Sequence, residues 1–183
     1  MISTFGDTLM TDEDIIGCKF MIEPFHRDQV QPVSYDVRLG DSYKRLRSKR
    51  ARNIARPSES EWEAYDHVDE IRIMPHEFLL ACTYETVRLP PCVMAQLVGK
   101  STVARQGLII ESAGLIDPGF EGQITLELHN LTDTELILPV GIRIGQLEFM
   151  HLASPPAHWY GQDATGSHYQ RQMGATAPKG DLS

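Results

Sequence analysis

The sequence has few cysteines and no long apolar run, and each of these shortages excludes a class of protein. Its three cysteines, Cys18, Cys82 and Cys92, are widely spaced and odd in number, which gives neither a disulfide framework nor paired metal-ligand spacing. No stretch approaches the roughly 18 apolar residues of a membrane span, and the N-terminus lacks the basic and then apolar pattern of a signal peptide. We therefore expect a cytoplasmic protein with buried thiols and no membrane partner.

Positive charge is also scarce, because 17 Lys and Arg residues face 25 Asp and Glu residues and the net charge is −8 at pH 7. This balance argues against bulk binding to nucleic acid, so an anionic ligand would need a local cluster of donors. The length of 183 residues suits a single domain with a real core.

Two zinc-binding motifs are missing. Zinc nucleobase deaminases carry H-x-E and P-C-x-x-C, but Pro91-Cys92 is not followed by a second cysteine, and His67 is followed at two residues by Asp69. The H-E-x-x-H helix of zinc hydrolases also fails, because His76-Glu77 leads into an apolar run. We expect no zinc site.

A polar cluster opens the central stretch of the chain, residues 99–130. Gly99-Lys100-Ser101-Thr102 looks like the end of a P-loop, but a P-loop needs a glycine about five residues earlier, where this chain has Met94. Lys100, the two hydroxyls and Arg105 still place donors within two turns if residues 101–106 form a short helix. An anion-binding cradle is one interpretation of this cluster.

The same stretch ends in an alternating strand. Successive strand side chains point to opposite faces, which puts Ile124, Leu126 and Leu128 on one face and Thr125, Glu127 and His129 on the other. Glu127 therefore lies on the polar face of a strand whose other face is core. A solvated sheet face would explain it, and so would a functional carboxylate.

Short apolar runs separated by turn residues predict a mainly β chain. Thr11 is expected to cap a short helix whose first turn is acidic. Strands are expected over residues 20–22, 35–39, 71–74, 78–84, 86–89, 93–98, 135–138 and 142–152, with Gly40 ending the second. This pattern favours an all-β sandwich or distorted barrel with one or two short helices.

Two segments stand apart in composition. A basic block (Lys44, Arg45, Arg47, Lys49, Arg50, Arg52 and Arg56) precedes an acidic one (Glu59, Glu61, Glu63, Asp66, Asp69 and Glu70). We interpret residues 44–70 as a solvated excursion between strands, with phosphate or nucleic-acid binding as the alternative. Residues 157–183 are polar with few aliphatics and form a tail that cannot bury much of itself.

Three motifs give the chain a resemblance to the dCTP deaminase family of the dUTPase-like superfamily, from about Met10 to Lys179. They lie at residues 31–40, at 99–107 with 116–130, and at 160–172. The resemblance implies a dUTPase-like distorted β-barrel or jelly-roll over residues 1–156 and a tail, 157–183, that closes over the nucleotide. It also implies a homotrimer with active sites between subunits, and zinc-free deamination of dCTP to dUTP with Mg²⁺ bound through the triphosphate.

The resemblance also implies roles for single residues. Glu127 would be the general base for the water that attacks C4 of cytosine, and Ser101 and Arg105 would position that water, the carboxylate and the phosphates. Asp117 would bind the sugar 3′-hydroxyl. The other implied substrate contacts are Lys100, Thr102, Val103, Ala104, Thr125, Leu126, Gln146, Tyr160, His168 and Gln172. The chain departs from the family pattern at His168, where Lys is usual, and in a segment 107–116 that is one residue shorter.

Three functions stay open. Residues 113–117 resemble the bifunctional branch, which deaminates dCTP and then hydrolyses dUTP to dUMP and pyrophosphate. They also resemble the dUTPase motif whose aspartate activates water, so a dUTPase alone is the second possibility. A nucleotide-sensing trimer is the third. Glu127 with Ser101 and Arg105 favours deamination, because binding alone needs no general base, and ligands of the dCTP, dUTP and dTTP type are expected.

Overall fold

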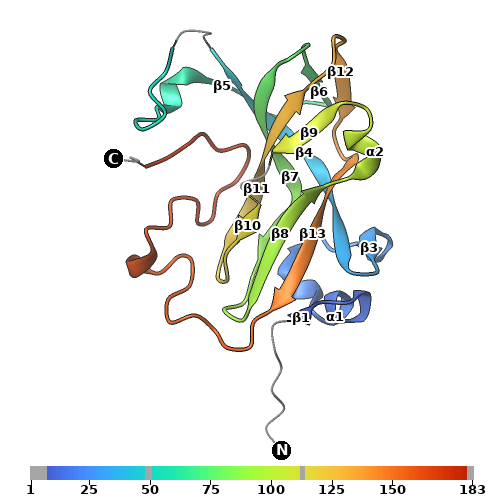
Figure 1. The fold of residues 1–183 in the computed structure, drawn as a ribbon, viewed down its shortest axis with the longest axis vertical. Helices are drawn as coiled ribbons and strands as arrows, with labels where there is room; N and C mark the ends of the chain where they lie inside the picture. The colour runs from blue at the N-terminus through green and yellow to red at the C-terminus, as the bar shows by residue number, and fades with distance from the viewer. Residues whose placement is uncertain (1–7, 48–50, 112–113, 181–183) are drawn as a thin grey trace, which may run out of the picture.

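The computed structural model describes residues 8–47, 51–111 and 114–180, and this part of the chain is mainly β (Figure 1). Its two α-helices are α1 (Asp12–Gly17) and α2 (Ser101–Ala104). Its strands are β1 (Thr8–Leu9), β2 (Ile22–Glu23), β3 (Val30–Gln31), β4 (Ser34–Leu46), β5 (Trp62–Tyr65), β6 (Glu70–Ile73), β7 (Phe78–Arg88), β8 (Val93–Gly99), β9 (Leu108–Glu111), β10 (Leu115–Ile116), β11 (Glu121–Asn130), β12 (Leu136–Pro139) and β13 (Arg143–His151). Short 3-10 helices span Lys19–Met21, Arg27–Gln29, Glu59–Glu61 and Asp163–Thr165. The predicted mainly β class with one or two short helices is confirmed.

Most strands belong to one curled sheet whose path runs β10–β8–β13–β4–β7–β11–β9. Strand β4 joins its two halves, because its first part pairs with β13 and its second with β7. The prediction that Gly40 ends this strand was wrong. A Cβ at Gly40 would lie 2.5 Å from the Cys82 sulfur and 2.9 Å from the Thr83 carbonyl oxygen, so glycine allows β4 to pass close to β7.

The start of α1 agrees with the prediction. Thr11 caps the helix, the Thr11 N–H donates to the Asp14 carboxylate at 2.9 Å, and the acidic first turn complements the helix dipole. The strand predicted over residues 20–22 was wrong, since Lys19–Met21 is a 3-10 turn that follows α1. The adjacent residues Met21, at the end of this turn, and Ile22, at the start of β2, are both buried in the core.

The two strands predicted over residues 78–84 and 86–89 form one strand, β7. The polar residue at the expected break, Glu85, is fully buried, and its carboxylate accepts from the Arg38 Nε at 2.7 Å and from the Arg38 backbone N–H at 2.8 Å. A charge-assisted pair compensates the buried carboxylate, so the strand continues.

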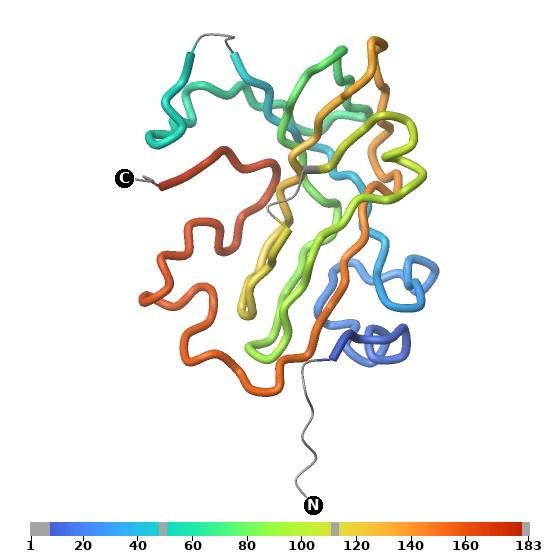
Figure 2. The backbone as a smooth tube through the Cα atoms, in the orientation of Figure 1, coloured from blue at the N-terminus to red at the C-terminus, as the bar shows by residue number. Residues whose placement is uncertain are grey.

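The excursion predicted over residues 44–70 is shorter than expected. Lys44 and Arg45 belong to β4, and β5, which the sequence reading missed, pairs with β4 inside the acidic block. Lys49 and Arg50 lie outside the described residues. The rest of the segment returns toward the sheet, as the cyan and teal tube in Figure 2 shows.

The core confirms the alternation of β11, because Ile124, Leu126 and Leu128 are buried and Thr125 and Glu127 are half-buried on the other face. Nowhere in residues 8–47, 51–111 and 114–180 is there a helix that is long and apolar enough to cross a membrane.

Candidate functional site

A cavity of about 540 Å³ lies over the polar face of β11, under the C-terminal tail. Five of the predicted site residues line it: Asp117, Thr125, Glu127, Tyr160 and Gln172. They come from three places along the chain, namely the turn after β10, strand β11 and the tail. The fold thus brings part of the predicted site together around one space.

Strand β11 holds Glu127 in a fixed place. The strand is paired on both sides, and Glu127 lies opposite Leu80 of β7 and opposite the backbone of Glu111 of β9. The neighbouring Leu126 has a fully buried side chain, so toward a ligand it can offer only its backbone. A strand with both edges paired cannot shift without breaking two hydrogen-bonded ladders, which suits a carboxylate that must meet its target accurately.

Hydrogen bonds join the tail to the beginning of β11. Gln123 donates its backbone N–H to the Gln172 carbonyl at 3.0 Å, and the Gln172 side-chain Nε2 donates to the Gln123 carbonyl at 2.7 Å. The Arg171 N–H donates to the Glu121 carbonyl at 2.6 Å. Gln172 Oε1 is buried and has no hydrogen-bond partner among the residues that the structure describes. The tail therefore brings an unused acceptor to the wall of the cavity.

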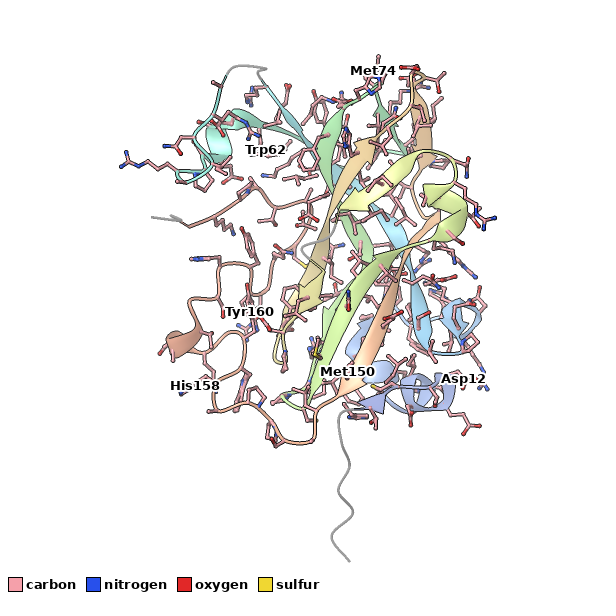
Figure 3. All side chains as sticks on the ribbon, in the orientation of Figure 1. Asp12, Trp62, Met74, Met150, His158 and Tyr160 are labelled. Carbon is pink, nitrogen blue, oxygen red and sulfur yellow. The ribbon has the colours of Figure 1, made fainter. Side chains whose placement is uncertain are left out.

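Tyr160 holds the first part of the tail, and Figure 3 labels it there. Its ring packs against Phe120 with centroids 5.8 Å apart, its N–H donates to the Pro118 carbonyl at 2.8 Å, and its hydroxyl accepts from the Tyr169 N–H at 2.9 Å. Burial raises the pKa of Tyr160 above its ordinary value. The phenol stays protonated at neutral pH and keeps its hydrogen for a ligand.

The larger part of the predicted site lies elsewhere in the chain. None of Lys100, Ser101, Thr102, Val103, Ala104, Arg105, Gln146 and His168 lines the cavity. In Figure 1, α2 is on the right of the sheet and the tail is on the left. Ser101, Thr102 and Arg105 are exposed, as is His168 in the tail. Within one chain, the predicted catalytic residues therefore lie in two groups: Glu127 at the cavity, and Ser101 with Arg105 at α2.

Lys100 and Gln146 sit on a polar patch built by strands β4, β8 and β13. Lys100 Nζ lies 2.7 Å from the Asp36 carboxylate, which is almost completely buried, and Gln146 Nε2 donates to the Ser34 hydroxyl at 3.2 Å. Arg143 reaches the same carboxylate at 3.7 Å. Asp36 thus fixes the position of Lys100 beside the exposed donors of α2, which is an arrangement suited to an anion.

Sequence reasoning missed part of the cavity wall. Arg52, Asn53 and Trp62 line the cavity, although their segment was interpreted as a solvated excursion. The one signal that could have identified it is a tryptophan within an acidic block, because such a large apolar surface usually finds a partner.

A prediction follows from the glycine beneath the tail. Gly122 has φ 147°, and a Cβ there would lie 2.8 Å from the Gln172 carbonyl oxygen and 3.0 Å from the Gln172 nitrogen. Gly122→Ala should therefore push the tail away from β11 and add backbone strain of about 1–3 kcal/mol. We expect a lower melting temperature and weaker nucleotide binding, measured by thermal unfolding and titration. Gly17→Ala is the matched control, because nothing lies within 4 Å of that position; equal effects of the two changes would contradict the prediction.

Comparison with known proteins agrees with this architecture. The family model described as dCTP deaminase-like matches residues 8–152. Proteins named "dCTP deaminase, dUMP-forming" are 43% identical in Bifidobacterium longum, over 92% of this chain and 92% of the relative, and 44% identical in Beutenbergia cavernae, over 93% and 94%. The 2′-deoxycytidine 5′-triphosphate deaminase structure from Agrobacterium tumefaciens superposes with a TM-score of 0.64 at 20% identity, covering 79% of this chain and 48% of that longer one.

The curled sheet with a cavity over β11 is of the dUTPase-like fold class, as predicted. The family match over most of the chain goes further. The chain belongs to the dCTP deaminase-like family.

Proposed function

We propose that this chain hydrolyses dCTP to dUTP and ammonia in the cytoplasm, and then hydrolyses dUTP to dUMP and pyrophosphate. The observation that carries the proposal is Glu127, a carboxylate held by a doubly paired strand in the wall of a nucleotide-sized cavity. The second step is supported by the relatives, whose printed name is "dCTP deaminase, dUMP-forming".

In the first step Glu127 takes a proton from water, and the oxygen of that water bonds to C4 of cytosine. The proton then passes to N3, the new hydroxyl on C4 gives its proton through Glu127 to the exocyclic nitrogen, and the bond between C4 and that nitrogen breaks, so that ammonia leaves and a carbonyl forms at C4. Gln172 Oε1, which has no partner within the described chain, can accept a hydrogen bond from the amino group. General acid–base catalysis of this kind contributes about 10²–10⁴-fold to a rate.

The site needs a second copy of the chain. Ser101 and Arg105, which would position the water and the carboxylate, are exposed on α2 and do not line the cavity that holds Glu127. A neighbouring subunit in a homotrimer can supply them across a symmetric interface. We infer that Lys100 and Gln146 of that neighbour bind the triphosphate, while Asp117 holds the sugar and Thr125 and Leu126 face the base.

Mg²⁺ enters this proposal with the substrate. Among the described residues, no three His, Cys, Asp or Glu side chains gather where they could hold a metal ion. Mg²⁺ commonly binds to substrate phosphates and water with little help from protein, so a triphosphate complex fits this chain. When bound, the ion neutralises phosphate charge, and Lys100 with the α2 donors does the same from the protein side.

We therefore predict that the purified protein contains no stoichiometric zinc and that chelating Mg²⁺ stops turnover of dCTP. Elemental analysis together with activity after chelation and after adding back each metal makes the measurement. One tightly bound zinc per chain, whose removal alone abolishes ammonia release, would refute the prediction.

The products decide between the candidate functions. With dCTP and Mg²⁺ we expect ammonia, dUMP and pyrophosphate to appear together, and with dUTP we expect dUMP and pyrophosphate without ammonia. Ammonia with accumulating dUTP would leave only the deaminase step. Hydrolysis of dUTP without any deamination would indicate a dUTPase, and nucleotide binding without either product would indicate a sensor.

A further inference from the structure

The segment of residues 51–62 lies outside the family motifs, yet several of its residues line the cavity. Arg52, Asn53, Ile54 and Pro57 line the cavity, and so does Pro178 near the end of the tail. Figure 1 shows this cyan and teal segment directly above the red end of the tail. The two segments are far apart in sequence, so their meeting is decided by tertiary structure.

Trp62 lies where the segment of residues 51–62 contacts the tail. It begins β5, the strand beside the second part of β4, yet only 5% of its surface is exposed. It forms a small cluster of buried side chains with Leu80, Ala175 and Ala177, separate from the main core. Phe78 stands edge-on to its ring with centroids 6.4 Å apart. The tail therefore contributes two of the buried side chains that surround Trp62.

Charged groups hold the segment in place around this tryptophan. The Arg52 guanidinium lies 5.8 Å from the centre of the Trp62 ring and 3.5 Å from the Glu61 carboxylate. Lys44 of β4 lies 2.6 Å from Glu59. The Lys44–Glu59 pair attaches the segment to β4, while Arg52 links two parts of the segment itself around Trp62.

The last described part of the tail, residues 174–180, has only small or polar side chains with which to hold itself to the sheet. Ala175 and Ala177 are small; the Ala175 N–H donates to the Ser42 hydroxyl at 2.9 Å, and the Thr176 N–H donates to the Thr125 hydroxyl at 3.2 Å. Such bonds replace bonds to water and contribute little net stability. When the tail leaves the sheet, water can replace its hydrogen bonds but not its apolar contact with Trp62, so this contact favours the docked tail.

Building on the proposed function, we propose that Trp62 is a positioning residue for the nucleotide site. It holds the tail at Ala175 and Ala177, and this keeps Gln172, a few residues earlier, with its unpaired Oε1 at the cavity wall. When the tail is held in only a fraction of molecules, the apparent affinity for the nucleotide falls by that fraction. The loss of Trp62 therefore appears in KM more than in kcat.

The first test needs no nucleotide. Arg171 is exposed, and its N–H is bonded to β11 only while the tail is docked. We expect Trp62→Ala to speed tryptic cleavage after Arg171 about tenfold or more and Trp62→Phe to restore most of the protection. Ala177→Asp places a charge against Trp62 without changing the barrel and should act like Trp62→Ala, so the test survives a Trp62 variant that fails to fold. Met173→Asp is its matched control, because Met173 is 67% exposed.

The second test measures KM for dCTP in a cycle of Trp62→Ala and Gln172→Ala in the full chain. If Trp62 acts through the tail, Gln172→Ala should cost much less in the Trp62→Ala background than in the natural one. Independent, multiplying effects would overturn the proposal, as would unchanged cleavage after Arg171 in both Trp62→Ala and Ala177→Asp. Failure of the proposed function looks different, because the cleavage result would hold while no dCTP is turned over.

Discussion

Glu127→Gln is expected to lower the rate of ammonia release from dCTP by about 10²–10⁴-fold and to leave nucleotide binding nearly intact. Glutamine keeps the shape and the hydrogen-bonding reach of the side chain but cannot accept the proton of the attacking water. The loss should therefore fall on kcat. Single-turnover ammonia release and titration with dCTP measure the two effects separately.

Two further variants sharpen this result. Glu135→Gln removes a carboxylate that makes an exposed pair with Arg72, and it should change neither quantity. Asp117→Asn should weaken the binding of every deoxynucleotide, and the hydrolysis of dUTP with it, because Asp117 is assigned to the sugar. Normal deamination by Glu127→Gln would show that this residue is not the base. If the variant lost only dUTP hydrolysis, the dUTPase function would be favoured.

Mixing two inactive variants is expected to restore activity. Arg105→Ala alone and Glu127→Gln alone should each lose most deamination, because a site that combines α2 of one copy with β11 of another has lost one of its two groups. In trimers assembled from equal amounts of both, about one site in four regains both natural residues by random combination. Activity should rise after the two variants are unfolded and refolded together, and not after folded proteins are simply combined.

The matched control for this experiment is a double variant that carries Arg105→Ala and Glu127→Gln in one chain. It is refolded once with the Arg105→Ala variant and once with the Glu127→Gln variant. It should rescue neither of them, since each mixed site still lacks one group. No gain in the mixture of single variants, with trimers demonstrated by sizing, would mean that Ser101 and Arg105 serve the cavity of their own chain. The proposed division of the site between subunits would then be wrong.

Local patterns in the sequence were enough for several features of this protein. The alternation along residues 124–129 predicted which side chains of β11 are buried, because a strand has a period of two whatever surrounds it. Thr11 and Asp14 predicted the helix start, since a cap needs only neighbours in the chain. The motifs at residues 31–40, at 99–107 with 116–130, and at 160–172 gave the family resemblance, and the family match confirms it.

Contacts between distant residues decided the rest. Glu85 does not break β7 because Arg38, 47 positions away in the chain, pairs with it in the core. Gly40 does not end β4 because Cys82 and Thr83 of the neighbouring strand approach its backbone. The separation of Ser101 and Arg105 from Glu127, and the seating of Ala177 on Trp62, likewise depend on how the sheet curls. A sequence pattern predicts features that depend on one strand or turn alone. Burial and charge pairing between distant residues depend on which segments the tertiary structure brings together.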